Sequence, residues 1–363
     1  MRVGIDAHMV GGQETGNETY VKGLVDGLTA RSDVDLMVYT AGSPWTDSSP
    51  HVQFQRLLTP NPYVRLGLEL PFRSLAQRLD VLHMSYTTPV WSAAPIVLTV
   101  HDICFATNPE WFSRRDLRVL RTFVPRAIRR AAHVITVSQD ARRQIVEHFG
   151  VPESKVSAIP NGPGKGAEAI APDEAGAQLA ALGLDPKRPY ALAVGNLQPR
   201  KNLVRLIEAI GRVRRRGHDI DLVVVGPKHF RAEEVTRAAA SSEGWIHVTG
   251  YVTDRQLAAC YSCCAVYVLP SLYEGFGLPA IEAMAHGVPI ACSNAGALPE
   301  VCGDAALLFD PRSVESIAGA VDRILSDPGM RQRLVLAAAA RVRLFDWRRT
   351  AELTLAVYRT VAR

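Results

Sequence analysis

Residues 271–289 run Ser-Leu-Tyr-Glu-Gly-Phe-Gly-Leu-Pro-Ala-Ile-Glu-Ala-Met-Ala-His-Gly-Val-Pro and follow the apolar segment 266–270. The apolar segment is typical of a buried strand. Pro279 suits the start of a helix, because its ring fixes φ and its missing N–H would have had no partner there. The stretch therefore predicts a strand, a loop and a helix in succession. Glu274 falls in the loop at the carboxyl end of the strand, and Glu282 falls in the first turn of the helix.

This loop is predicted to hold an anion beside two carboxylates. Gly275 and Gly277 let the backbone approach a ligand closely. Their N–H groups, together with the N-terminus of the helix, favour an anion, whereas Glu274 and Glu282 can accept hydrogen bonds from hydroxyl groups. A nucleotide sugar carries both phosphates and hydroxyls, so it is the ligand that we expect.

The same stretch resembles the Glu-x7-Glu signature of the retaining glycosyltransferases of family 4, which have two Rossmann-like domains (the GT-B fold). The likeness is carried by Glu-Gly-Phe-Gly-Leu-Pro-x-x-Glu-Ala-Met-Ala-x-Gly-x-Pro, from Glu274 to Pro289. It implies that Glu274 holds hydroxyls of the donor sugar and that Glu282 holds the ribose. The donor-binding residues between them would be Gly275, Phe276, Gly277 and Leu278. An ordinary loop that two acids happen to flank is the alternative.

Length and composition indicate a globular protein of two domains. A chain of 363 residues exceeds one typical core, and 47% hydrophobic with 21% charged residues is ordinary for a folded protein. No apolar run reaches the roughly 18 residues that a membrane span needs. Residues 1–6 resemble a first strand rather than a signal peptide, so we expect a cytoplasmic protein. A net charge of +5 is too mild and too scattered for nucleic-acid binding.

Strand and helix signals alternate along the whole chain. The expected strands are 2–7, 36–39, 81–83, 96–100, 134–137 and 156–159, then 190–194, 221–225, 246–248, 266–269, 289–292 and 306–309. Ser138 is a natural N-cap and Gly150 a natural stop for a helix over 139–149, and a second helix is expected over 203–216. The alternation predicts an α/β protein with parallel sheets and crossover helices. With the resemblance, it predicts the GT-B fold, in which two Rossmann-like, doubly wound domains face a cleft.

We expect an acceptor-binding domain over residues 1–165 and a nucleotide-sugar-binding domain over 173–344. The segment 163–172 is rich in Gly, Ala and Pro and is the best candidate linker. In the resembled family the terminal helix, here within 345–363, crosses back to the N-terminal domain. A helix that stays on the second domain is the alternative.

Arg200 and Lys201 lie in the segment Val194-Gly-Asn-Leu-Gln-Pro-Arg-Lys-Asn-Leu203, between a strand and a helix. Ligands of open α/β sheets bind at such strand ends, and adjacent cations there can hold two phosphates. The pair is similar to the Arg-Lys pair with which the family neutralises the departing diphosphate. A solvated turn is the alternative.

Two further candidates lie in the first half. Gly16, in the Gly-rich segment 11–20, matches the family position whose amide approaches the donor β-phosphate. His101 ends an expected strand and matches a family histidine that faces the donor sugar. A structural histidine is the alternative. The fingerprint GxGxxG is absent, which removes the main support for a nicotinamide or flavin cofactor.

Metal binding is not expected. Asp219 and Asp221 formally make a DxD motif, but they precede a buried strand as many αβ loops do. Cys260, Cys263 and Cys264 fall on a helix that begins at a Thr253-x-x-Gln capping box. Because no second CxxC and no histidine pair completes a zinc site, we interpret these cysteines as core thiols.

The resemblance implies a retaining, metal-independent hexosyltransferase that acts on a glycan, a glycolipid or a small-molecule hydroxyl acceptor. Segments 101–102, 109–111 and 198–201 look most like bacterial mannosyltransferases of polysaccharide or glycolipid synthesis, which favours GDP-mannose over UDP-sugars as donor. No side chain stands out as a nucleophile, so same-face attack is preferred to double displacement. A GT-B sugar-nucleotide epimerase and a non-catalytic nucleotide-sugar-binding protein are the alternatives.

Residues 114–130 are predicted to form an amphipathic helix. At 100° per residue its large apolar side chains share one side and its arginines the other, although Pro125 is expected to kink or split it. Two interpretations stay open. One is a surface helix with a solvated basic face, and the other is reversible attachment to anionic lipid. The second would suit a lipid-linked acceptor and would place the protein at the inner face of a membrane.

Overall fold

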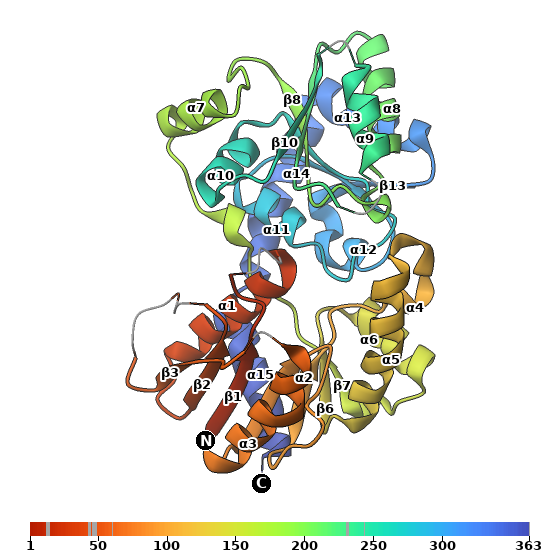
Figure 1. Cartoon of the computed structure of the whole chain (residues 1–363). Coiled ribbons are helices and arrows are strands. Elements are labelled where there is room, and N and C mark those ends of the chain that lie inside the picture. Colours follow the sequence, from red (N-terminus) through yellow and green to blue (C-terminus); the bar gives the residue numbers. More distant parts are fainter. Residues whose placement is uncertain are drawn as a thin grey trace. The chain divides into compact units, whose positions relative to one another are not determined.

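The computed structural model describes residues 1–11, 15–42, 45, 49–59, 61–229, 232–242 and 244–362. The chain forms two compact units, each built on a parallel sheet (Figure 1). Unit 1 comprises Met1–Pro109, Arg114–Gly162 and the chain from Asp346 onward, and unit 2 comprises Glu110–Ser113 and Pro163–Phe345. The predicted α/β class with two Rossmann-like domains is confirmed.

The sheet of unit 1 has the order β3-β2-β1-β4-β5-β6-β7, and all its strands are parallel. Its strands are β1 Arg2–Ala7, β2 Asp35–Thr40, β3 Val52–Arg56, β4 Val81–Ser85, β5 Ile96–Thr99, β6 His133–Thr136 and β7 Val156–Ala158. The sequence prediction missed β3. This strand lies at the edge of the sheet, so it has one neighbour and a weaker apolar pattern, Val-Gln-Phe-Gln-Arg.

The helices of unit 1 cover both faces of its sheet. They are α1 Thr15–Thr29, α2 Pro62–Val64, α3 Leu70–Ala76, α4 Cys104–Thr107, α5 Arg114–Arg130, α6 Gln139–Phe149 and α15 Trp347–Val361. A π-helical turn over Arg65–Glu69 joins α2 to α3, and 3-10 turns span Pro109–Trp111 and Glu153–Lys155. Ser138 caps α6, accepting from the Ala141 N–H at 3.1 Å, and Gly150 ends it in the left-handed region.

The terminal helix α15 belongs to unit 1, as predicted. It packs so closely on α1 that a Cβ at Gly27 would lie 2.5 Å from the backbone carbonyl oxygen of Trp347. A buried polar cluster also ties α15 to the sheet. His83 on β4 contacts the Tyr358 hydroxyl of α15 and lies 2.8 Å from the Thr99 hydroxyl. Burial lowers the pKa of His83 to about 3, so its ring is neutral.

Unit 2 has a six-stranded parallel sheet with the order β10-β9-β8-β11-β12-β13. Its strands are β8 Tyr190–Val194, β9 Asp221–Val225, β10 Ile246–Gly250, β11 Val266–Leu269, β12 Ile290–Ser293 and β13 Ala306–Phe309. The chain runs from β8 to β9 on one side and returns to β11 on the other. The carboxyl ends of β8 and β11 therefore meet at the switch point of the sheet, where ligands of such folds bind.

The helices of unit 2 bury both faces of this sheet. They are α7 Pro172–Ala181, α8 Leu203–Arg215, α9 Glu233–Ala240, α10 Asp254–Cys263, α11 Leu278–Ala285, α12 Leu298–Cys302, α13 Val314–Ser326 and α14 Pro328–Arg341. Alternate residues of each strand enter different cores. Tyr190 and Leu192 pack in one apolar cluster, and Ala191 and Ala193 pack in the other.

Two of the three cysteines predicted to be core thiols, Cys260 and Cys264, are buried, whereas Cys263 at the end of α10 is half-buried against the same cluster. Cys260 and Cys264 are buried in an apolar cluster of unit 2, and burial raises the pKa of Cys260 to about 12. The predicted capping box is present at the start of α10, because the Thr253 N–H donates to the Gln256 side chain at 3.0 Å. Across the ranges that the structure describes, no group of three or more His, Cys, Asp or Glu side chains is arranged to hold a metal ion.

The DxD carboxylates have structural partners. Arg188 binds Asp219 at 2.7 Å and Asp221 at 2.9 Å. Asp221 also contacts Arg214 at 3.3 Å and His247 at 3.2 Å. These ion pairs hold the start of β9 to the neighbouring turns, which supports the structural interpretation of the motif.

Helix α5 differs from the prediction at Pro125. It continues as one helix from Arg114 to Arg130, although Pro125 lies inside it. Beside the proline, the Arg126 guanidinium donates to the Thr122 carbonyl at 2.8 Å. None of the helices in the described parts of the chain is long and apolar enough to span a bilayer.

Candidate functional site

Arg200 and Lys201 lie in a 3-10 turn, Pro199–Lys201, that follows β8. The next residue, Asn202, adopts a left-handed backbone with φ of 57°. Its side-chain amide donates to the Pro270 carbonyl at 3.0 Å and to the Pro311 carbonyl at 2.7 Å. Asn202 therefore fastens the turn after β8 to the ends of β11 and β13, a role that the sequence prediction missed.

The turn after β8 and the loop after β11 are also joined through their backbones. The Leu272 N–H donates to the Arg200 carbonyl at 2.9 Å, and the Arg200 guanidinium donates to the Tyr273 carbonyl at 2.8 Å. Two loops that are about seventy positions apart in sequence are thus joined side by side at the predicted strand ends.

Glu274 is the centre of the site. Arg200 Nη1 lies 2.6 Å from Glu274 Oε2, and Lys201 Nζ lies 2.7 Å from Oε1. The Ser271 hydroxyl donates to Oε1 at 2.6 Å. Burial raises the pKa of the Glu274 carboxyl, but the two cations and the hydrogen bonds outweigh this and hold it at about 2. Glu274 is therefore ionised at neutral pH.

Two glycines allow this packing, and the sequence prediction overlooked both. Gly195 has φ of 142°, and a Cβ there would lie 2.7 Å from Lys201 Cε. Gly296 has φ of 60°, and a Cβ there would lie 2.6 Å from the Glu274 carbonyl oxygen. Both positions combine a left-handed backbone with close approach, which only glycine tolerates. Gly195 and Gly296 each follow a strand of the same sheet, and a glycine soon after an expected strand is the sequence signal that could have identified them.

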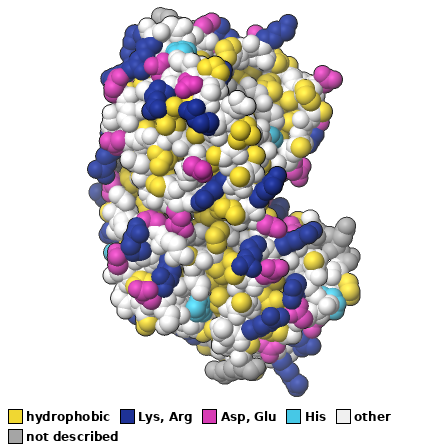
Figure 2. Space-filling model, turned by 180° about the vertical axis from the view of Figure 1, so that it is seen from behind, with side chains coloured by type: hydrophobic (Ala, Val, Ile, Leu, Met, Phe, Trp, Pro, Cys, Tyr) yellow, Lys and Arg dark blue, Asp and Glu magenta, His cyan; other side chains and the backbone are white. Residues whose placement is uncertain are grey.

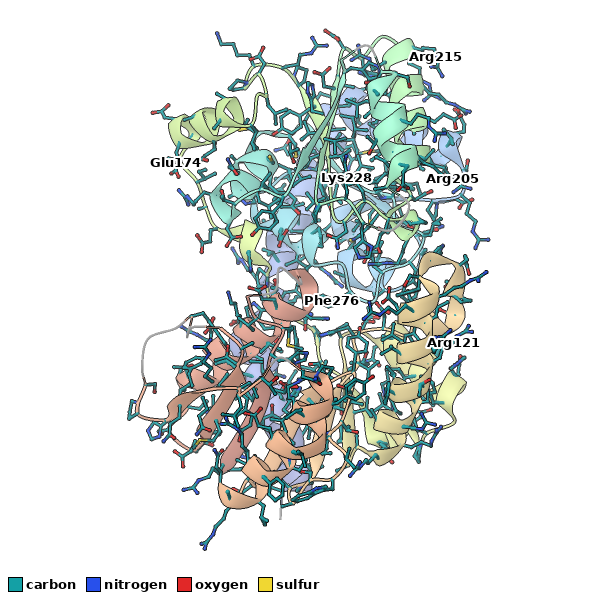
Figure 3. All side chains as sticks on the ribbon, in the orientation of Figure 1. Arg121, Glu174, Arg205, Arg215, Lys228 and Phe276 are labelled. Carbon is teal, nitrogen blue, oxygen red and sulfur yellow. The ribbon has the colours of Figure 1, made fainter. Side chains whose placement is uncertain are left out.

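The glycine-containing loop between Glu274 and Glu282 packs tightly. Gly277 is the N-cap of α11 with φ of 103°, and a Cβ there would lie 2.6 Å from the Leu298 side chain. Phe276, labelled in Figure 3, is buried, and its ring meets that of Phe345 edge to face at 5.7 Å. Gly275 is buried as well, and Leu278 is half-buried. The loop is therefore packed within unit 2 and does not extend into solvent.

Glu282 lies one turn later than predicted. Helix α11 begins at Leu278, so Glu282 is in its second turn and not in its first. The carboxylate is 6% exposed, and burial raises its pKa. The Tyr261 hydroxyl donates to Oε2 at 2.8 Å, while Oε1 lies against Gly164, where a Cβ would be 1.8 Å away.

The segment expected to be a linker helps to build this part of the site. Gly164 precedes the 3-10 turn Lys165–Ala167, and the Gly166 carbonyl lies 2.6 Å from His286 Nε2. The His286 ring stacks on Tyr261 at 5.7 Å. Sequence reasoning missed these contributions, because no local pattern links residues so far apart in the chain.

The two remaining candidates belong to unit 1. His101 follows β5, and among the described residues its buried Nε2 has no hydrogen-bond partner. Burial lowers the pKa of His101 to about 4, so its imidazole is neutral at pH 7. The Tyr20 ring meets it edge to face at 4.8 Å.

Gly16 lies in the first turn of α1 and not in a loop, because the helix begins at Thr15. The preceding residues 12–14 of the predicted Gly-rich segment lie outside the described ranges. Gly16 is exposed, and among the described residues no heavy atom lies within 4 Å of a Cβ built there.

The arrangement in unit 2 is suited to a phosphorylated ligand with hydroxyl groups. Two cations converge on one carboxylate, which leaves a net positive charge at the switch point of the sheet. The N-terminus of α11 adds N–H groups and a favourable dipole for an anion. Glu282 supplies a second carboxylate on the same helix.

Comparison with known proteins agrees with this chemistry. A family model of glycosyl transferases group 1 matches residues 176–341, and a model of Glycosyltransferase Family 4 matches residues 15–163. The O-antigen chain mannosyltransferase B of Escherichia coli is 32% identical over 278 residues, which cover 72% of this chain and 70% of that protein. The chain belongs to glycosyltransferase family 4.

Another relative of this glycosyltransferase is a protein that is longer than this chain. The serotype-specific mannosyltransferase WbdA of Escherichia coli is 31% identical over 235 residues, and the match spans 62% of this chain but only 28% of WbdA. Among solved structures, sucrose-phosphate synthase from Thermosynechococcus elongatus superposes with a TM-score of 0.78 at 23% identity, covering 99% of this chain and 98% of that one. The predicted GT-B fold is confirmed.

Proposed function

We propose that this glycosyltransferase moves a hexose, preferably mannose, from a nucleotide sugar to a hydroxyl group with retention of configuration. The acceptor is a glycan, a glycolipid or a small molecule. The observation that carries the proposal is the buried, ionised Glu274, which holds Arg200 and Lys201 at the switch point of the sheet. The mannosyltransferase relatives support mannose, and with it GDP-mannose as the favoured donor.

Arg200 and Lys201 are proposed to bind the diphosphate of the donor. A guanidinium can form a fork to two phosphate oxygens, and an ammonium acts as a point charge. Glu274 orients both cations, and it is proposed to accept hydrogen bonds from the donor sugar. Since the cations are already held in place, they can stabilise the charge of the departing diphosphate without reorganising.

In the proposed reaction, the bond between the anomeric carbon and the phosphate oxygen breaks. The acceptor oxygen then bonds to the same face of that carbon, and the leaving phosphate takes the acceptor's proton. The products are a glycoside and a nucleoside diphosphate. The amides of Gly16 and Gly277 would assist the leaving phosphate, and the neutral His101 would hydrogen-bond a sugar hydroxyl through its buried Nε2. Gly275, Phe276 and Leu278 complete the proposed donor site.

Replacing Glu282 with glutamine is expected to raise the donor KM about tenfold and to change kcat less than twofold. A ribose contact is made equally in the ground and transition states, so its loss appears in KM. A charge-assisted hydrogen bond is worth about 1.5–3 kcal/mol. Steady-state kinetics with varied donor measures both constants. Glutamine keeps the volume beside Gly164 and Tyr261, so a melting temperature near that of the wild type is the control. An unchanged KM would exclude the ribose role.

The activity is tested by incubating the chain with GDP-mannose or UDP-glucose and a hydroxyl acceptor, and measuring released nucleoside diphosphate. A transferase releases GDP or UDP and forms a glycoside. An epimerase would return an isomerised nucleotide sugar, and a binding protein would leave the donor unchanged. GDP release from GDP-mannose that exceeds UDP release is the expected result, and the reverse order would contradict the proposed donor.

Transfer is expected to keep its rate within about twofold in the presence of EDTA. Arg200 and Lys201 supply the cationic charge that a metal gives to other transferases, and Asp219 and Asp221 are engaged by Arg188. The same assay, with and without chelator, measures the effect. Activity that is lost with EDTA and restored by Mg²⁺ or Mn²⁺ would show that a metal is required.

A further inference from the structure

Exposed apolar side chains gather in one part of unit 1. Among the described residues of this unit, all of the large apolar side chains that are exposed fall between positions 58 and 123: Leu58, Tyr63, Val64, Leu68, Phe72, Leu75, Val90, Trp91, Val119 and Phe123. In unit 2 such residues come singly from different elements, for example Leu336 on α14. A contiguous exposed apolar surface on a soluble domain marks an interaction site.

The helices that carry Phe72 and Leu75 (α3) and Val119 and Phe123 (α5) lie on one face of the seven-stranded sheet. Helix α3 leads from β3 to β4, and α5 leads from β5 to β6. Both crossovers advance in the same direction along the sheet, and right-handed connections then place both helices on the same face. Helix α1 connects β1 to β2 in the opposite direction, so it lies with α15 on the other face (Figure 1).

The loop between β4 and β5 joins α3 to α5. The Trp91 ring of this loop meets the Phe72 ring of α3 edge to face at 5.6 Å. At the other end, the Arg130 guanidinium of α5 donates to the Pro89 carbonyl at 2.8 Å. The two helices and the loop thus form one continuous surface, which we call the α3–α5 face. Phe72 is 57% exposed and Leu75 is 56% exposed.

The charges of the α3–α5 face are almost all positive. Helix α5 carries the exposed arginines Arg114, Arg115, Arg118, Arg121, Arg126, Arg129 and Arg130, against Asp116. Arg121 is labelled on this helix in Figure 3. On the α3 side, Glu69 is buried and paired with Arg73 at 2.8 Å. The segment 86–100 has no charged residue.

The opposite face of unit 1 has a different character. It mixes acidic and basic side chains (Figure 2), and several of them pair with each other. Arg359 of α15 contacts Asp33, and Arg349 lies 3.4 Å from Glu352. The excess of positive charge beside apolar side chains is therefore a property of the α3–α5 face and not of the unit as a whole.

We propose that the α3–α5 face binds the surface of an anionic lipid bilayer. Its apolar side chains would enter the boundary between headgroups and acyl chains, with Tyr63 and Trp91 at the level that amphipathic aromatic rings prefer. The arginines of α5 would contact lipid phosphates. Two copies of this face would oppose like charges across a two-fold axis, which disfavours a homodimer. The inference deepens the proposed function by presenting the enzyme to a lipid-linked acceptor.

Co-sedimentation of the full chain with vesicles tests this surface without donor or acceptor, so its failure would leave the transferase proposal untouched. We expect binding to vesicles of phosphatidylcholine with phosphatidylglycerol at low salt, at least tenfold weaker binding to pure phosphatidylcholine, and weakening as salt rises. The variant Phe72→Ser/Trp91→Ser should bind the anionic vesicles at least tenfold more weakly. The matched control, Leu336→Ser/Leu344→Ser in unit 2, should bind like the wild type.

A second measurement uses the wild-type protein, so it does not depend on whether the Phe72→Ser/Trp91→Ser variant folds. Trp91 fluorescence should be quenched by vesicles with brominated acyl chains, and the quenching should be lost in Trp91→Phe. Equal recovery in the supernatant with anionic and neutral vesicles at low salt would overturn the proposal. So would undiminished binding of the Phe72→Ser/Trp91→Ser protein, or a dimer in solution that this variant abolishes, because the face would then bind a second copy.

Discussion

Replacing Glu274 with glutamine is expected to reduce kcat at least about a hundredfold, equivalent to about 2.7 kcal/mol of barrier. Arg200 and Lys201 both contact this carboxylate within 2.7 Å. Glutamine keeps the shape but removes the charge that orients the two cations. Because Glu274 is buried and ionised, the free energy of unfolding should also fall by about 3 kcal/mol, the lower end of the cost of breaking a buried ion pair.

Initial rates and denaturant unfolding of the same preparation measure the two effects of Glu274→Gln. Ser271→Ala is the matched control, because it removes one hydrogen bond to the same carboxylate and leaves all three charges in place. Its unfolding free energy should change by about 1 kcal/mol, and its kcat should fall far less. A Glu274→Gln enzyme with wild-type turnover would remove this carboxylate from the mechanism.

Replacing Lys201 with alanine is expected to lower kcat at least about tenfold and to weaken nucleotide binding less. Lys201 is 8% exposed and lies between Gly195 and Glu274. Its contact with phosphate should strengthen as negative charge develops on the leaving group, so its loss appears mainly in the chemical step.

Steady-state kinetics and calorimetric titration with GDP separate these two effects. Lys187→Ala is the control, since it removes the same charge from an exposed position just before β8, at the opposite end of the strand. If Lys201→Ala and Lys187→Ala turn over alike, the ammonium of Lys201 has no part in stabilising the departing diphosphate.

Much of this architecture was predictable from local patterns. Strand β11, the bare loop after it and helix α11 follow from an apolar run, two glycines and Pro279. Helix α6 begins and ends where Ser138 and Gly150 predict. These signals concern neighbours in sequence, where turn geometry and capping decide the structure.

The remainder depends on contacts between distant parts of the chain. Glu282 accepts a hydrogen bond from Tyr261 and packs on Gly164. No periodic pattern in the sequence predicts either contact. The sequence places Glu274 in a loop, but only tertiary packing shows that its carboxylate is buried there. The short helices between β3 and β4 were not predicted either. There Arg65 is buried in an ion pair with Asp6, far from it in sequence.

The most direct test of the proposed donor site is a crystal structure of the chain with GDP. The Arg200 guanidinium and the Lys201 ammonium should each lie about 3 Å from diphosphate oxygens, at hydrogen-bonding distance. The Glu282 carboxylate should lie equally close to the ribose hydroxyls. GDP bound away from the carboxyl ends of β8 and β11, or a diphosphate that touches neither cation, would contradict the assignment.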